Sequence, residues 1–291
     1  MHKACAVAAA LAFAAGACAT TGGLRVPAGP WQADPAAATE MASAFAACRG
    51  VRTLSAEIAV RGQVRGTRLR GRVIAGFERG GRVRLEAPAP FGAPIFVVTA
   101  VADRTTIWFP RDRRVLRNAS FDDVIEALIG FRRSADDLLA LLSGCLGVSA
   151  PDVGPVSRQG TGWLMSRLAD GTTAYAARDA QHWRIAGGRQ DGGPAALAWT
   201  IGYDASATGF PSLVRLWQGQ DAGATGGASA ASAAPASSAL TLQIGQLETN
   251  TAIDARAFEA HVPADASPMT LADLRQIGPL ADRTGGQEPH P

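Results

Sequence analysis

The sequence predicts a mainly β protein, with one antiparallel sheet covered by two helices from the middle of the chain. Three observations lead to this expectation. Apolar and polar residues alternate strictly over several segments, as in strands with one buried and one wet face. Turns rich in glycine separate these segments, as antiparallel neighbours require. Two segments between the runs of strands have the apolar spacing of amphipathic helices. A sheet of about ten strands should curl.

The first 17 residues indicate a signal peptide that is removed from the mature chain. An apolar stretch at residues 4–15 follows a short basic start and is too short to span a bilayer. Small residues then precede Cys18, and this arrangement resembles the lipobox of bacterial lipoproteins, whose cysteine is acylated. Ala15 stands where that motif usually has leucine. An ordinary signal peptide cut beside this cysteine is the alternative.

Residues 18–36 are rich in Thr, Gly, Pro and Ala, a composition typical of a flexible tether. Ala19 follows Cys18, in place of the aspartate that resembles an inner-membrane retention signal. We therefore expect a lipid-anchored protein of the cell outer membrane that faces the periplasm. Each buried CH₂ of an acyl chain contributes about 0.8 kcal/mol, so several chains anchor firmly.

Two cysteines, Cys48 and Cys145, remain in the mature chain once Cys5 is removed and Cys18 is lipidated. One disulfide is therefore possible in an oxidising periplasm. In the chain-entropy model a disulfide that closes a loop of about 100 residues stabilises the folded protein by about 4–5 kcal/mol. Two buried free thiols are the alternative.

The mature chain is expected to form one domain over residues 37–280. A helix should begin at Asp34-Pro35 and end at Gly50, with Met41 and Phe45 on one face. Strands follow, with turns at Gly62–Gly66 and Gly80-Gly81. The expected strands lie at 54–63, 69–77, 83–87, 95–102, 105–109, 163–168, 172–177, 183–186, 197–203, 213–217 and 240–247.

Two capping signals mark the helices in the middle of the chain. Ser120 with Asp123, and Ser134 with Asp137, each precede an apolar helical face. A short helix is expected from Thr270 to Ile277. Residues 218–238 hold no apolar residue larger than alanine and predict a disordered insertion, and residues 281–291 form a polar tail.

Composition and motifs exclude several classes of function. No apolar run is long enough for a polytopic membrane protein, and a net charge of +3 does not favour a nucleic-acid partner. His182, His261 and His290 lack metal-ligand spacing, and neither a Gly-x-Ser-x-Gly elbow nor a phosphate loop occurs. We expect no enzyme activity, no cofactor and no metal.

Three segments resemble the lipoprotein-localisation family of LolA and LolB, and more closely LolB. Leu85–Gly92 looks like the family's strand and Asn-Pro-Leu-Gly loop, and Asp122–Gly144 looks like its lid helices. Trp199–Asp204 looks like its Trp-x-x-x-Tyr-Gly-Gly-Tyr-Asp region. The resemblance runs from about Leu54 to Leu247. The insertion, the extension from Asp254 and the two internal cysteines depart from the family pattern.

This resemblance implies an incomplete antiparallel β-barrel closed by two helices over an apolar cavity. It implies a monomer that binds acyl chains, accepts lipoproteins from a LolA-like periplasmic carrier and inserts them into the inner leaflet of the outer membrane. A carrier of other envelope lipids or glycolipids on the same fold is one alternative. A non-catalytic structural or assembly lipoprotein that binds protein partners is another.

The resemblance and the apolar faces together give the candidate site residues. The membrane-insertion loop would be Pro90-Phe91-Gly92, where the matching leucine of LolB protrudes, although Phe91 folded back on the sheet is the alternative. Ordinary core residues are the alternative for the cavity wall. The expected wall residues are Ile58, Val60, Val73, Phe77, Leu85, Phe96, Trp108, Leu128, Leu142, Trp199 and Leu242.

Charge is distributed unevenly along the chain. Between Arg52 and Arg117 there are 14 arginines against five acidic residues, and from Leu240 onward three against seven. The polar face of the first strands is therefore basic and could lie near anionic headgroups or an acidic partner. A solvated face without such a role is the alternative.

Overall fold

The fold is described from a computed structural model. It covers residues 24–64, 66–102, 104–148, 151–180, 182–190, 198–218, 238–278 and 280. The expected signal peptide, the lipidated Cys18, most of the predicted insertion and the polar tail lie outside the described residues.

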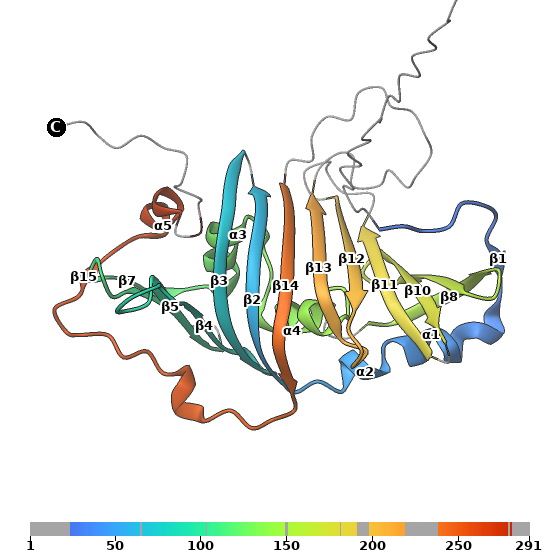
Figure 1. The fold of residues 1–291 in the computed structure, drawn as a ribbon, viewed down its shortest axis with the longest axis horizontal. Helices are drawn as coiled ribbons and strands as arrows, with labels where there is room; N and C mark the ends of the chain where they lie inside the picture. Colours follow the sequence, from blue (N-terminus) through green and yellow to red (C-terminus); the bar gives the residue numbers. More distant parts are fainter. Residues whose placement is uncertain are drawn as a thin grey trace, which may run out of the picture.

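The protein is mainly β, and the strands of its described residues form one open sheet of 15 strands (Figure 1). The first meander comprises β2 (Thr53–Val64), β3 (Thr67–Glu78), β4 (Arg82–Ala87), β5 (Phe96–Val101), β6 (Arg104–Phe109) and β7 (Arg114–Ala119). The second comprises β8 (Val153–Gln159), β9 (Trp163–Leu168), β10 (Thr172–Asp179), β11 (His182–Gln190), β12 (Trp199–Ala205), β13 (Pro211–Gln218) and β14 (Ser238–Thr249). Two short strands, β1 (Gln32–Ala33) and β15 (Ser267–Pro268), extend the edges beside β8 and β7.

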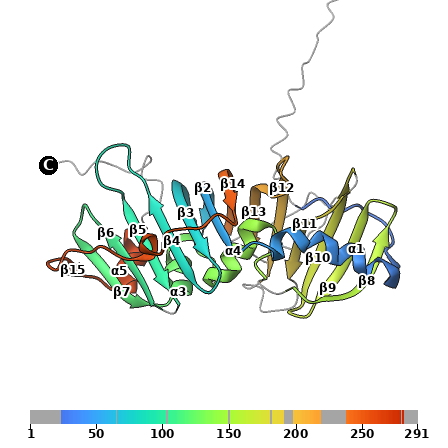
Figure 2. The ribbon, with the colours of Figure 1, turned by 90° about the horizontal axis from the view of Figure 1, so that it is seen from below.

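The two meanders join because β14, the last strand of the second, pairs with β2, the first strand of the first. All neighbours are antiparallel except β15 and β7. In the part of the chain that the structure describes, the edges at β7 and β8, each extended by one short strand, do not pair with each other, so the sheet does not close. Helices α3 (Phe121–Ile129) and α4 (Ala135–Ser143) connect these two edges and lie on one face of the sheet (Figure 2). We call this the inner face and the opposite one the outer face.

The predicted alternation is confirmed along the first strands. Every second residue is buried on the inner face over Leu54–Val60 in β2 and Val73–Phe77 in β3, which produces one core shared with α3 and α4. The buried residues of these two strands are Leu54, Ala56, Ile58, Val60, Val64, Leu69, Val73, Ala75 and Phe77.

The strand count of about ten was too low. β7 and β8 were not expected, because β7 buries the adjacent residues Val115 and Leu116 and so breaks the alternation, and β8 buries only Val156 and contains Gly154 and Pro155. The turn expected at Gly62–Gly66 is shorter, since β2 continues through Gly62 to Val64. A side chain at residue 62 would collide with the carbonyl oxygen of Ala239 on the adjacent β14, which explains glycine inside this strand.

The serine caps are confirmed in both helices of the inner face. The Ser120 hydroxyl accepts a hydrogen bond from the Asp123 amide at 3.2 Å, and the Ser134 hydroxyl accepts one from the Asp137 amide at 3.1 Å. Gly130 and Gly144 end the helices in the left-handed conformation.

The helix expected from Asp34 to Gly50 is divided into three pieces. A 3₁₀ turn (Pro35–Ala37) precedes α1 (Ala38–Ala44) and α2 (Ala46–Arg49). Asp34 makes no side-chain cap. Its carboxylate instead accepts a hydrogen bond from Arg158 Nε on β8 at 2.6 Å.

Part of the expected tether is packed on the sheet. Leu24 lies against Gly187 on the outer face, where a Cβ would approach the leucine Cδ1 to 2.5 Å. Gln159 Nε2 donates to the carbonyl oxygen of Ala28 at 2.8 Å, and residues 32 and 33 form β1. These contacts correct the expectation of a free linker for residues 24–33.

The C-terminal extension wraps around the first meander (Figures 1 and 2). A 3₁₀ turn (Ala255–Phe258) contacts β4 and β5, and Arg84 Nη1 donates to the carbonyl oxygen of Ala257. The chain then forms β15 beside β7 and continues into α5 (Leu271–Ile277), which packs against α3. None of the helices in the described part of the chain is long and apolar enough to cross a membrane.

Candidate functional site

An apolar cavity lies between the inner face of the sheet and the pair α3 and α4. Its volume is about 60 Å³. All its lining side chains are apolar, and they come from five strands, both helices and Leu280, three residues beyond the end of α5. They are Ile58, Val60, Val73, Leu85, Phe96, Ile125, Leu128, Ile129, Leu138, Leu142, Leu242 and Leu280.

The structure brings eight of the eleven expected wall residues to this cavity. They are Ile58, Val60, Val73, Leu85, Phe96, Leu128, Leu142 and Leu242. Ile125, Ile129 and Leu138 were not expected as wall residues, although their helical spacing marks the apolar faces of α3 and α4. The local sequence around Leu280 gives no such signal.

Three expected wall residues lie elsewhere. Trp108 is on the outer face, because its neighbours Ile107 and Phe109 occupy the inward positions of β6. Phe77 is buried in the core, four residues beyond Val73 on β3, which is about 13 Å along a strand. Trp199 belongs to β12 of the second meander, where its Nε1 donates to Gln190 Oε1 at 2.7 Å.

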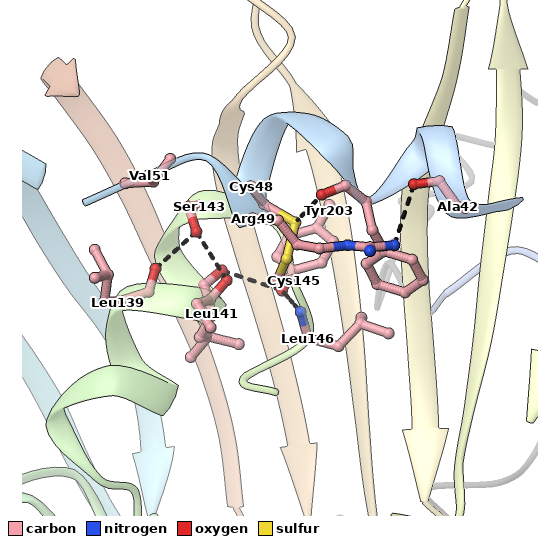
Figure 3. Close-up of a disulfide and its surroundings, with 12 residues drawn as sticks. Ala42, Cys48, Arg49, Val51, Leu139, Leu141, Ser143, Cys145, Leu146 and Tyr203 are labelled. Carbon is pink, nitrogen blue, oxygen red and sulfur yellow. Dashed lines mark hydrogen bonds between the residues drawn. A yellow bond between two sulfur atoms is a disulfide. The ribbon is translucent and has the colours of Figure 1, made fainter. Parts of the chain in front are cut away.

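A disulfide anchors the end of α4 (Figure 3). Cys48 of α2 is bonded to Cys145, with a Cα–Cα distance of 5.6 Å and a sequence separation of 97 residues. Both cysteines are buried. In the chain-entropy model a cross-link of this span lowers the entropy of the unfolded chain and so stabilises the folded protein by about 4–5 kcal/mol.

Tyr203 of β12 holds the same segment from the sheet (Figure 3). Its hydroxyl accepts a hydrogen bond from the Leu146 amide at 2.9 Å and donates one to the carbonyl oxygen of Leu141 at 3.1 Å. Burial raises the pKa of Tyr203, so the phenol stays neutral and can donate. The end of α4 is therefore fixed by one covalent bond and two hydrogen bonds.

The linker between α3 and α4 carries two arginines in different surroundings. Arg132 is exposed and pairs with the first-turn carboxylates of α3, including Asp123. The hydrogen bonds from Ser120 and Arg132 lower the pKa of Asp123. Arg133 lies over the Trp199 ring at 5.3 Å, and burial lowers its pKa. This linker thus carries two charges, whereas the cavity beside it is apolar.

The loop between β4 and β5 presents a phenylalanine to solvent. Phe91 is 88% exposed, so its side chain does not fold back on the sheet. Arg111, in the neighbouring β6–β7 turn, donates from Nη2 to the carbonyl oxygen of Phe91 at 2.6 Å and from Nε to that of Ala93 at 3.3 Å. Pro90 and Gly92 flank Phe91, and Gly92 has a φ of +74°. The Phe91 ring thus lies at the tip of a loop that the Arg111 guanidinium stabilises through two hydrogen bonds.

The outer face of β2 and β3 is basic. Arg61 lies directly opposite Arg70 in the strand register, and Arg68 is exposed on the same strand as Arg70. No acidic side chain of the described residues forms an ion pair with these three arginines, whereas Arg72 pairs with Glu57 at 2.9 Å. The β2–β3 turn and the Phe91 loop lie at the same end of the strands, because neighbouring strands run in opposite directions.

A larger groove of about 670 Å³ lies between α1, α2 and the ends of β10–β13, and the disulfide-bonded Cys48 forms part of its wall. Small side chains make up most of its wall, together with the charged residues Asp179 and Arg184, which pair with each other at 3.4 Å. Among the described residues, no group of three or more His, Cys, Asp or Glu could hold a metal ion. The apolar cavity is the better candidate for a lipid site, since its wall carries no polar residue.

Comparisons with known proteins give distant structural likenesses. No family model matches the sequence, and no curated protein matches it significantly. A DUF1329 family protein from Desulfovibrio piger is 10% identical, with a TM-score of 0.46 and coverage of 78% of this chain and 98% of the other. A LolA superfamily protein from Nitrosomonas europaea, NE2245, is 9% identical, with a TM-score of 0.46 and coverage of 76% and 97%. Lipoprotein LppX from Mycobacterium tuberculosis is 11% identical, with a TM-score of 0.31 and coverage of 76% and 100%. At such scores, function has to be argued from the cavity itself.

Proposed function

We propose that this protein binds the acyl chains of lipids or lipoproteins in the apolar cavity beneath α3 and α4. One observation carries the proposal: every residue that lines the cavity is apolar, and sheet and helices both contribute. Burial of a hydrocarbon chain is favourable by about 25 cal/mol per Å² of apolar surface, without any specific polar contact. The wall requires no catalytic group for this task.

The finer proposal is a lipid-anchored protein of the outer membrane, facing the periplasm, that accepts lipoproteins from a LolA-like carrier and inserts them. The exposed ring of Phe91 supports a membrane contact, since apolar loop tips enter the interface. Attraction to anionic headgroups at the same end of the strands is supported by Arg61, Arg68 and Arg70. Acylation at Cys18 would supply the anchor.

The cavity must enlarge to hold a ligand. Its volume of about 60 Å³ is well below the roughly 300–1,000 Å³ of ordinary ligand sites. The end of α4 is fixed by the disulfide and by Tyr203, so we propose that α3 moves away from the sheet. Gly130 and the linker to Ser134 then act as the hinge.

Binding of a fluorescent fatty acid to residues 19–291 tests the proposal. Val73 lines the cavity, and the adjacent Ile74 on the same strand is 51% exposed on the outer face. We expect Val73→Phe to fill the cavity and weaken binding at least about fivefold, whereas the matched Ile74→Phe leaves binding unchanged. Equal affinities of the two variants would contradict the cavity as the binding site.

Two further measurements separate the alternatives. Mass spectrometry of material that copurifies with the protein distinguishes lipopeptides from other envelope lipids and glycolipids. Transfer of a lipoprotein from a LolA-like carrier to membranes tests insertion directly. A protein that binds no fatty acid and copurifies with no lipid would instead be a structural or assembly lipoprotein.

A further inference from the structure

The C-terminal extension places one side chain inside the apolar cavity. Leu280 is 4% exposed and lines the cavity together with Val73 and Leu85. It follows α5, and no other lining residue lies in this extension beyond β14. The extension therefore contributes to the site as well as wrapping the sheet.

A backbone hydrogen bond fixes this residue on the edge of β3. The Arg70 amide donates to the carbonyl oxygen of Leu280 at 2.9 Å. β4 pairs only with Ile74–Glu78, so the half of β3 before Ile74 is not paired with β4. Leu280 thus lies beside β3 beyond its last pair with β4, in the gap where the two strands separate.

Gly71 provides the space for the leucine side chain. It lies on the inner face, opposite Val60, and a Cβ at this position would be 2.7 Å from Leu280 Cδ2. A larger residue would push the leucine away. Glycine inside a strand weakens the strand, and the close approach of Leu280 explains why glycine nevertheless stands at residue 71.

Helix α5 holds the segment that contains Leu280 against the lid, which is the pair of helices α3 and α4. The Thr270 hydroxyl and the Asp273 carboxylate form a reciprocal capping box, and Arg114 Nη2 lies 3.3 Å from Asp273 Oδ2. α5 packs on α3, and Gly278 ends it in the left-handed conformation, which turns the chain toward β3. The segment consequently links α3 to the sheet across the gap.

We propose that Leu280 is an intrinsic plug, which occupies the end of the cavity in the free protein and is displaced by an incoming acyl chain. This inference rests on the proposed acyl-chain site. Displacement of Leu280 releases the Arg70 amide and frees the gap between β3 and β4 as a passage into the cavity. It also removes a link between α3 and the sheet, so binding and lid movement are coupled. The apparent affinity for acyl chains is the affinity of the open cavity multiplied by the fraction of molecules in which Leu280 is displaced.

Three chains test the plug: residues 19–291, a chain that ends at Gly278, and a control that ends at Ala281 and keeps Leu280. With a fluorescent fatty acid as the probe, we expect the chain ending at Gly278 to bind on the order of tenfold more tightly than the other two, since burial of a leucine has this strength. Leu280→Asn in residues 19–291 should reproduce the gain. Thermal unfolding checks that every chain is folded.

Hydrogen exchange supplies a second readout that does not depend on affinity. The Arg70 amide should exchange slowly in residues 19–291, and faster after addition of the fatty acid or in the chain ending at Gly278. Equal affinities of all chains for the fatty acid, or an Arg70 amide that stays equally protected, would overturn the plug while leaving acyl binding intact. Absence of binding in all chains would overturn the proposed function and the plug with it.

Discussion

The hydroxyl of Tyr203 accepts a hydrogen bond from the amide of Leu146, the residue that follows the disulfide-bonded Cys145. The same hydroxyl donates to Leu141 near the end of α4. One side chain of β12 thus fastens the end of the lid to the second meander, beside the covalent bond to α2. The lid, formed by α3 and α4, therefore has one fixed end, which is why we assign the proposed opening movement to α3.

Replacement of Tyr203 by phenylalanine should lower the free energy of unfolding by about 1–3 kcal/mol, because the buried Leu146 amide loses its partner. Urea denaturation followed by circular dichroism measures the change. The fold should persist, since the disulfide still holds Cys145. An unfolding free energy equal to that of the unaltered protein would show that this hydroxyl does not stabilise the lid.

Gly130, at the end of α3, is constrained in two ways. Its φ is +74°, and a Cβ there would collide with Val64 Cγ1 at the end of β2. Gly66 has a similar φ of +84° with no atom within 4 Å of an added Cβ, and therefore serves as the control. Gly66→Ala should cost about 1–2 kcal/mol from backbone strain alone, and Gly130→Ala should cost about 1–3 kcal/mol more from the collision. Equal costs in thermal unfolding would indicate that Val64 adjusts freely.

Stability should decrease in acid, because Arg215 lowers the pKa of Asp204. Arg215 Nη1 and Nη2 donate to the two carboxylate oxygens at 2.8 and 2.6 Å. A carboxylate whose folded pKa lies below its unfolded value of 3.8 contributes stability above that pH, and the contribution is lost as the pH falls through the folded pKa. We expect Asp204→Asn to flatten the fall in unfolding free energy below about pH 4. Identical slopes for the variant and the unaltered protein would assign the acid dependence to other groups.

The sheet and its lid could be predicted from local patterns. Period-two alternation requires Ile58, Val60 and Val73 to share one face, and the serine caps locate α3 and α4. β7 and β8 could not be found this way, since β7 buries two adjacent residues, Val115 and Leu116, and β8 buries only Val156. Their places depend on pairing with longer neighbours.

The cavity was only partly predictable, for a related reason. Residue type suggested Trp108, but strand parity places it on the outer face, because Ile107 and Phe109 point inward. Leu280 has no periodic neighbours, and its burial follows from the docking of α5 on α3, a contact between distant parts of the chain. Local sequence therefore identifies the walls made by strands and helices, and not the residue supplied by the extension.

Phe91 gives the sharpest test of membrane contact. Because its side chain is 88% exposed, Phe91→Glu should leave the unfolding temperature unchanged. If the ring enters the interface, the charge should weaken cosedimentation with phosphatidylglycerol vesicles on the order of tenfold or more, the strength expected from burial of a phenylalanine. Phe91→Trp should retain binding, since tryptophan favours the same depth. Ile74→Glu, at an exposed apolar residue of the outer face, controls for the added charge and should bind as the unaltered protein does. Unchanged vesicle binding by Phe91→Glu would rule out this loop as the point of insertion, whereas equal losses for Phe91→Glu and Ile74→Glu would indicate a general electrostatic effect of the basic face.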